Sequence, residues 1–303
     1  MGMGWGGRFR ATGWAARLWP TLGMLAAAVM AAPAALAEQA HDWQLGMQPS
    51  ATPVRDHIDF LNDDILLPII AIITVFVLGL LLYTIVRFNA RRHPTPSQTT
   101  HNTVIEVIWT TVPILILLVI FVPSIKLLYY NDHTQHADMT LKVTGHQWYW
   151  SYEYPDQSDI SFDSTMIPEE EQVKRGLPRL LEVDNPVVLP VGATVRILVS
   201  GTDVIHSWFV PSAGVQEYAV VGRTNESWMR LERPGTYYGQ CNQICGLNHP
   251  FMPIEIKAVD KAEFPKWLEC QKKPPKEGCG AFTKTADDKN SAAPVVASAR
   301  PAQ

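Results

Sequence analysis

Hydrophobic and polar positions divide the chain into an apolar first part and a mixed remainder. The run ILLPIIAIITVFVLGLLLYTIV, residues 65–86, carries no charge, and this length suffices for a helix to cross a hydrocarbon core. A second apolar run covers residues 104–128. Because a helix satisfies its own backbone in lipid, the pattern predicts two transmembrane helices, 65–86 and 104–128, joined as a hairpin.

The charges that flank the first run differ in sign, with Asp59, Asp63 and Asp64 before it and Arg87, Arg91 and Arg92 after it. Short loops rich in Lys and Arg face the cytoplasm, so we expect the loop 87–103 there. The segment 38–64 and everything after residue 128 are then expected on the opposite side, which is the periplasm in a bacterial inner membrane. Membrane lipid would surround the hairpin.

The first 37 residues have the pattern of a cleaved signal peptide. Arg8, Arg10 and Arg17 precede the apolar core LGMLAAAVMAAPA, and Ala35-Leu36-Ala37 forms a small-x-small cleavage site. The alternative is a short, Ala-rich membrane anchor, although Pro33 interrupts the run. Cleavage predicts an exported protein in an oxidising compartment.

Beyond residue 129 the pattern changes to short runs that alternate polar with β-branched or aromatic residues. They read MTLKVTG, QWYWSYEY, RLLEV, TVRILVS, SWMRL, TYYGQ and IEIKAV, with Pro, Gly, Asp and Asn between them. Such runs predict half-buried strands, and this number of strands favours a small β-sandwich or barrel over residues 129–268. Residues 269–303 are rich in Lys, Pro, Ala and Ser and predict a flexible tail. The predicted fold class is therefore membrane-anchored and all-β.

Charge and cysteine content narrow the function. A net charge of −4, a pI of about 6.1 and no basic run argue against nucleic acid as a partner. The four cysteines all lie in the last quarter of the chain, at positions 241, 245, 270 and 279. Cys270 and Cys279 bracket a short polar segment and are expected to form a disulfide, or else to stay free or contact a partner. No CxxCH motif is present, which excludes attached c-type haem.

The remaining two cysteines belong to a metal-binding pattern, Cys241-x3-Cys245-x3-His249-x2-Met252, and His206 lies upstream at the end of a predicted strand. Thiolate and thioether ligands select copper, and imidazole suits it as well. Two thiolates can bridge two copper ions, with one histidine for each and Met252 plus a backbone carbonyl as weak ligands. The alternatives are a structural zinc site, in which the Met would be idle, and a Cys241–Cys245 disulfide.

The segments VTGHQWYWSYEYPD, DVIHSW, GTYYGQC and CNQICGLNHPFMPI resemble subunit II of haem-copper cytochrome c oxidase, and the resemblance covers residues 55–268. It implies a Greek-key, cupredoxin-like domain that holds the dinuclear copper centre CuA, with cytochrome c and oxidase subunit I as partners. The implied copper ligands are His206, Cys241, Cys245, His249 and Met252, with the backbone carbonyl of Gln243.

The resemblance also implies roles outside the copper site. Trp148 matches the residue through which cytochrome c passes its electron, where the alternative is an interfacial or core aromatic residue. Glu106 matches a glutamate beside a proton pathway into subunit I, where the alternative is an acid reaching the membrane interface from the end of a helix. The residues that resemble the acidic docking patch for cytochrome c, which could also be an ordinary solvated face, are Asp156, Asp159, Asp184 and Asp203.

The sequence departs from the family pattern at two places. Gln243 occupies a position where the family usually has a glutamate that helps to bind magnesium, so a magnesium site is in doubt because an amide is a weaker ligand for this hard cation. Gln216, Tyr218 and Val221 replace a basic residue, an aspartate and a proline. The alternative function is that of a copper-free subunit II in a quinol oxidase, which should lack the cysteines that this chain retains.

Overall fold

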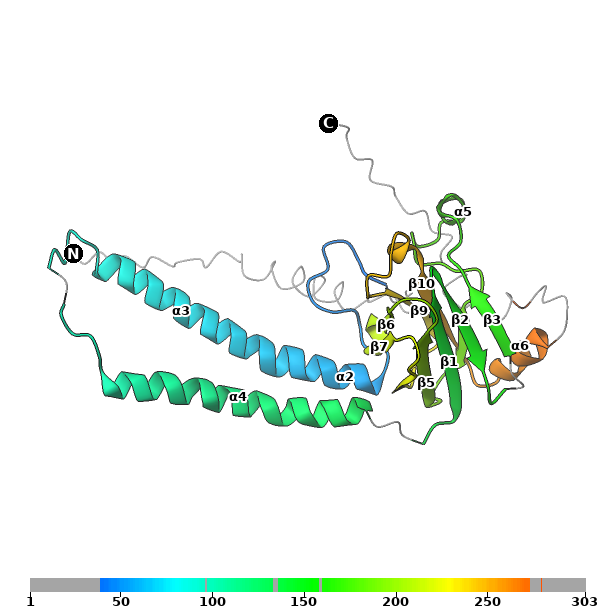
Figure 1. Cartoon of the computed structure of the whole chain (residues 1–303), viewed down its shortest axis with the longest axis horizontal. Coiled ribbons are helices and arrows are strands. Elements are labelled where there is room, and N and C mark those ends of the chain that lie inside the picture. Colours follow the sequence, from blue (N-terminus) through cyan, green and yellow to red (C-terminus); the bar gives the residue numbers. More distant parts are fainter. Residues whose placement is uncertain (1–38, 96, 133–135, 158–159, 273–278, 280–303) are drawn as a thin grey trace, which may run out of the picture. The chain divides into compact units, whose positions relative to one another are not determined.

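The computed structural model describes residues 39–95, 97–132, 136–157, 160–272 and 279 (Figure 1). The predicted signal peptide, residues 1–37, lies outside the described residues. So does most of the predicted tail, although its first residues belong to helix α6, Phe264–Gln271.

Two long helical runs form the predicted hairpin. The first consists of α2 (Pro53–Asp59), the π-helical η1 (Phe60–Leu66) and α3 (Leu67–Arg87), and the second is α4 (Thr103–Asp132). Both are long and apolar enough to cross a membrane, and α4 contacts α2 and η1 of the first run. The first run begins well before the apolar residues because the Thr52 side chain caps it and Pro53 occupies its first turn.

Ten strands within the described residues form two five-stranded sheets, in the orders β3-β2-β1-β5-β8 and β4-β10-β9-β6-β7. β1 pairs in parallel with β5, as β4 does with β10, and the other pairs are antiparallel. The strands are β1 (Met139–His146), β2 (Tyr149–Tyr154), β3 (Ile160–Ser164), β4 (Val187–Pro190), β5 (Val195–Gly201), β6 (His206–Val210), β7 (Val215–Ala219), β8 (Asn225–Met229), β9 (Gly235–Cys241) and β10 (Pro253–Val259). The predicted β-sandwich behind a two-helix hairpin is confirmed.

The prediction of a strand at RLLEV, residues 179–183, is wrong. Residues 179–181 form a turn that follows α5 (Glu169–Arg175), in which Leu180 has a positive φ of 62°, and Val183 makes only an isolated bridge with Met166. Side chains rather than a neighbouring strand take up its backbone N–H groups: Leu180 N donates to Gln172 Oε1 at 2.7 Å and Val183 N donates to Glu255 Oε2 at 3.1 Å. His206 likewise begins β6 instead of ending the preceding strand.

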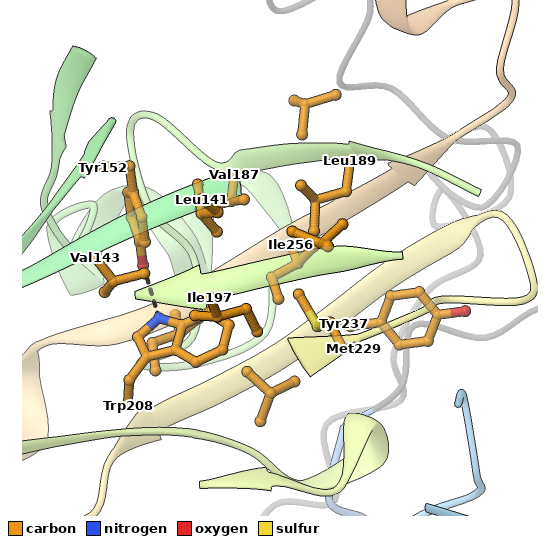
Figure 2. Packing of buried hydrophobic residues seen from close by; sticks show 14 of the residues in the cluster. Leu141, Val143, Tyr152, Val187, Leu189, Ile197, Trp208, Met229, Tyr237 and Ile256 are labelled. Carbon is orange, nitrogen blue, oxygen red and sulfur yellow. Dashed lines mark hydrogen bonds between the residues drawn. The ribbon is translucent and has the colours of Figure 1, made fainter. Parts of the chain in front are cut away.

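The core lies between the two sheets (Figure 2). Burial alternates along β1 as the sequence pattern predicts, so that Leu141 and Val143 are fully buried. Ile197 and Ile256 are also fully buried, and each such side chain contributes roughly 1.5–3 kcal/mol to stability. Trp208 Nε1 donates to Tyr152 Oη at 3.3 Å, joining β6 to β2. This packing fixes β6 and β9, the two strands that present the candidate metal ligands.

Candidate metal centre

Two neighbouring strands and one loop bring the predicted copper ligands together. His206 begins β6 and Cys241 ends β9, and these strands pair with Trp208 opposite Cys241. The chain then forms the loop 242–252, which carries Cys245, His249 and Met252, before it returns as β10. Asn242 N donates to the backbone oxygen of Ser207 at 3.1 Å and ties the start of this loop to β6.

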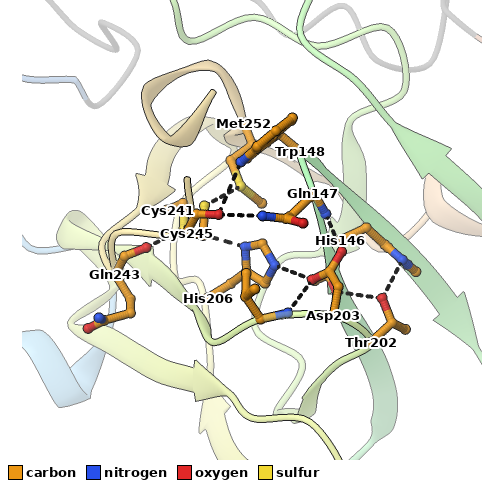
Figure 3. Close-up of polar contacts among 12 residues, drawn as sticks. His146, Gln147, Trp148, Thr202, Asp203, His206, Cys241, Gln243, Cys245 and Met252 are labelled. Carbon is orange, nitrogen blue, oxygen red and sulfur yellow. Dashed lines mark hydrogen bonds and ion pairs between the residues drawn. The ribbon is translucent and has the colours of Figure 1, made fainter. Parts of the chain in front are cut away.

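The donor atoms of His206, Cys241, Cys245 and Met252 converge on one small region (Figure 3). The possible ligand atoms of His206, Cys241 and Cys245 lie within 4.8 Å of one another, and all three residues are buried. Cys241 Sγ lies 4.0 Å from His206 Nδ1, and Cys245 Sγ lies 3.6 Å from both His249 Nδ1 and Met252 Sδ. All five predicted side-chain ligands therefore belong to one cluster.

The two cysteines of the cluster are free thiols. Their sulfur atoms are 3.9 Å apart, about twice the length of a disulfide bond. The Cys241–Cys245 disulfide considered from the sequence is therefore not formed. Cys241 Sγ also lies 3.4 Å from the backbone oxygen of Gln243, the carbonyl that the family resemblance assigns to copper.

The two thiols differ in acidity because their neighbours differ. Burial opposes ionisation of Cys241, but hydrogen bonds from His206 and from the backbone of Ser207 and Gln243 lower its pKa to about 7. Burial raises the pKa of Cys245 to about 12, and the charge of the Cys241 thiolate adds to this effect. The pair therefore loses its first proton mainly from Cys241.

A second layer of hydrogen bonds surrounds the ligands. Burial disfavours a charge on His206, but its bonds to Cys241 and Asp203 outweigh this and raise the His206 pKa. Burial would likewise raise the pKa of Asp203, but hydrogen bonds from His206, Val204 and Gln147 lower it. Asp203 is therefore a carboxylate beside a buried imidazole, the arrangement that commonly orients metal-binding histidines.

Trp148, the residue expected to receive electrons, is half-buried beside the cluster. Its Nε1 donates to the backbone oxygen of Cys245 at 3.3 Å, and Gln147 Nε2 donates to the same oxygen at 2.8 Å. Trp150 Nε1 donates to the backbone oxygen of Met252 at 3.1 Å. The aromatic segment is thus bonded to the ligand loop at two positions.

The predicted acidic docking residues do not form one cluster through these contacts. Asp156 accepts a hydrogen bond from Thr140 N at 2.6 Å, and Asp184 accepts bonds from Thr165 N and Oγ1 at 2.7 and 2.8 Å. Asp203 faces His206, and Asp159 lies outside the described residues. Each of the three described acids therefore accepts hydrogen bonds from residues close to it in the domain.

Glu106 and the second cysteine pair lie in other parts of the chain. Asn102 caps the start of α4, and its own backbone N–H donates to Glu106 Oε1 at 3.3 Å, so this acid takes part in a reciprocal helix cap. Cys270 and Cys279 form a disulfide at the end of α6.

Comparison with known proteins identifies the family. Residues 139–259 match the family model of the cytochrome c oxidase subunit II periplasmic domain, and residues 40–127 match the family model of its transmembrane domain. It is 48% identical to a probable cytochrome c oxidase subunit 2 from Rickettsia bellii, over 76% of this chain and 85% of the relative. The chain belongs to the cytochrome c oxidase subunit II family.

Two further proteins are also similar to this chain. A cytochrome c oxidase subunit 2 from Cereibacter sphaeroides is 46% identical, over 74% of this chain and 79% of the relative. The crystal structure of the periplasmic domain of subunit II (CoxB) of Bradyrhizobium japonicum is 47% identical, covers 46% of this chain and 97% of that chain, and gives a TM-score of 0.43. The two matched domains of the family coincide with the hairpin and the sandwich.

The sequence did not indicate which residues would hold the ligands in place. The hydrogen bonds of Gln147 with Asp203 and Cys245 join segments that are far apart in the sequence, and Asp203 also bonds to His206. The sequence signal available for Asp203 was its position three residues before His206, and an acid at that spacing is too common to be diagnostic.

Proposed function

We propose that this chain accepts electrons from cytochrome c and passes them to haem in subunit I of the oxidase, which reduces oxygen to water and pumps protons. Two copper ions held by the cluster, as the CuA centre, would take up and release one electron at a time. The proposed ligands are the side chains of His206, Cys241, Cys245, His249 and Met252, with the backbone carbonyl of Gln243.

One observation carries the proposal: the donors form two similar sets. Cys241 has His206 Nδ1 at 4.0 Å and the carbonyl oxygen of Gln243 at 3.4 Å. Cys245 has His249 Nδ1 and Met252 Sδ, both at 3.6 Å. Each set contains one thiol, one imidazole and one weak donor. The thiol sulfurs of the two sets lie 3.9 Å apart. Soft donors of this kind favour copper, and two sets favour two ions.

The surrounding chain would keep this site dry and rigid. His206 is fully buried, while Cys241, Cys245 and Met252 are 6%, 4% and 2% exposed. Strands β6 and β9 fix two of the ligands, and the hydrogen bonds from Trp148 and Trp150 fix the backbone beside two others. A rigid site keeps nearly the same geometry when it gains or loses an electron, so electron transfer is fast.

We assign the point of electron arrival to Trp148, because its ring is partly exposed and its Nε1–H bonds directly to the backbone of Cys245. The two membrane-spanning helices would place the sandwich on the periplasmic side of a bacterial inner membrane. We also infer that Gln243 weakens any magnesium site at the boundary with subunit I, because its amide carries no charge.

Copper content and electron uptake together test the proposal. The oxidase assembled with this chain should hold two copper ions in the chain and oxidise reduced cytochrome c rapidly. Cys245→Ser should lower the copper content and abolish fast uptake. A Cys270→Ser, Cys279→Ser double variant removes two sulfurs elsewhere and should keep both copper ions.

Full copper content and fast uptake in Cys245→Ser would refute the proposed site. A copper-free oxidase that instead oxidises a quinol would support the quinol-oxidase alternative, which the retained ligand set does not favour.

A further inference from the structure

Gly145 occupies an inward position of β1 at which the alternation of the strand predicts a core side chain. The two inward residues before it, Leu141 and Val143, are fully buried. Gly145 is buried as well, but it contributes no side chain to the core. A glycine inside a strand often marks a place where another part of the molecule approaches the backbone closely.

The approaching group is the ring of His206, a proposed copper ligand. A Cβ atom at position 145 would lie 3.0 Å from His206 Cδ2 and 3.1 Å from His206 Cγ. It would also lie 3.1 Å from Trp150 Cζ3. Carbon atoms in favourable contact are about 3.5–4.0 Å apart, so a methyl group at this position would displace one ring or the other. The missing side chain therefore leaves the space in which the imidazole lies.

Both rings are tied to the proposed ligand set. His206 is fully buried, and its Nδ1 lies 4.0 Å from Cys241 Sγ. Trp150 is fully buried too, and its Nε1 donates to the backbone oxygen of Met252 at 3.1 Å. The two rings meet edge to face, with their centroids 5.9 Å apart and their planes at 65°. A displacement of either ring would thus reach a ligand.

The backbone of Gly145 has little freedom to move away from the rings. Gly145 pairs with Trp150 of β2 on one side and with Gly201 of β5 on the other. Its carbonyl oxygen accepts hydrogen bonds from Thr202 N at 3.2 Å and from Thr202 Oγ1 at 3.3 Å. A side chain added at position 145 would therefore move the rings rather than the strand.

We propose that Gly145 is a positioning residue for electron transfer, because the absence of its side chain sets the place of the His206 ring relative to Cys241 and so keeps the two donor sets alike. This inference rests on the proposed function. It assigns a role in the metal centre to a residue that binds no metal itself.

Gly145→Ala adds a single methyl group at the point of closest approach. The displaced His206 ring should weaken the first donor set, so copper loss from the assembled oxidase to a chelator should accelerate at least about tenfold. The electron paramagnetic resonance (EPR) spectrum should show unequal coupling to the two copper nuclei. The kcat with reduced cytochrome c should fall, while KM stays unchanged because position 145 is buried.

Val143→Ile is the matched control. It adds a methyl group to the same inward face of β1, at a residue that already packs in the hydrophobic core, and such overpacking lowers stability. Its copper retention and EPR spectrum should nevertheless match those of the unsubstituted chain. Two outcomes would overturn the inference: normal copper retention and spectrum in Gly145→Ala, or an equal defect in Val143→Ile, which would trace the loss to overpacking alone.

A second pair of variants applies where Gly145→Ala alone fails to fold. Trp150→Phe replaces the indole by a smaller ring that lacks Cζ3, which removes the contact on one side of the added methyl group. The contact with His206 remains, so Gly145→Ala in the Trp150→Phe background should still lose copper faster than Trp150→Phe alone. Equal rates of copper loss in these two variants would contradict the positioning role.

A measurement on the metal-free chain separates this inference from the proposed function. Nuclear Overhauser contacts of the His206 ring protons should show the ring displaced in Gly145→Ala relative to the unsubstituted chain. A displaced ring supports the positioning role even where the unsubstituted chain binds no copper, a failure that would count against the proposed function alone. An unmoved ring contradicts the inference whether or not copper binds.

Discussion

The two free thiols should react at very different rates in the metal-free chain. Exposure does not distinguish them, because Cys241 is 6% and Cys245 4% exposed. Their pKa values do: about 7 for Cys241, which His206 and nearby backbone groups stabilise as a thiolate, and about 12 for Cys245, which burial and the Cys241 charge keep protonated. Alkylation requires the thiolate, so Cys241 should be modified first.

The size of this preference follows from the two pKa values. Near neutral pH about half of Cys241 is ionised, while the ionised fraction of Cys245 is roughly five orders of magnitude smaller. The thiolate of higher pKa is intrinsically more nucleophilic, so the Cys245 thiolate should react roughly two orders of magnitude faster than the Cys241 thiolate. The net preference for Cys241 should be roughly hundredfold or more.

Iodoacetamide labelling of the metal-free chain from acid to alkaline pH, with fragment-ion sequencing to locate the label, measures both rates. The Cys241 rate should be half-maximal near its pKa of about 7. In Cys241→Ala, the label should enter Cys245 faster than in the unsubstituted chain, because the neighbouring thiolate is gone. Equal rates at the two positions, or faster labelling of Cys245 in the unsubstituted chain, would refute the assigned acidities.

Three further predictions concern other acids. Burial, followed by the nearby Glu182, raises the pKa of Glu255 from 4.5 to about 7, so the folded chain keeps a proton that the unfolded chain releases. The associated stability is complete below about pH 4.5 and should fall by roughly 3 kcal/mol up to about pH 7; Glu255→Gln should flatten the pH dependence of the thermal midpoint, and an unchanged curve contradicts this. Glu106→Gln can still accept the helix-cap bond but lacks the charge, so proton uptake by the oxidase should slow with normal copper content; full turnover defeats the proton role. Neutralising Asp156 and Asp184 together should raise KM for cytochrome c at low salt more than at high salt, and an unaltered salt dependence removes both from the docking surface.

Local patterns were sufficient to predict the hairpin, the sandwich and the ligand cluster. Apolar runs of membrane length predict the spanning helices, and alternation predicts half-buried strands such as β1. The spacing of Cys241, Cys245, His249 and Met252 is confined to one short segment of the chain. Where the first helix begins was not predictable from apolarity, because the Thr52 cap and Pro53 decide it.

Contacts between distant segments account for what the sequence did not reveal. RLLEV has the composition of a strand, but Gln172 and Glu255 bind its backbone N–H groups and make it a turn. Asp203 looked like a surface acid, and only the approach of Gln147 and His206 shows that both of its oxygens are engaged. Both cases depend on which side chains a fold places opposite a segment.

The electron paramagnetic resonance spectrum of the purified chain loaded with copper and poised with one unpaired electron tests the central claim most directly. The two matched donor sets around Cys241 and Cys245 predict a seven-line hyperfine pattern, because the electron is shared by two equivalent copper nuclei. A four-line pattern, which reports a single copper nucleus, would contradict the dinuclear centre.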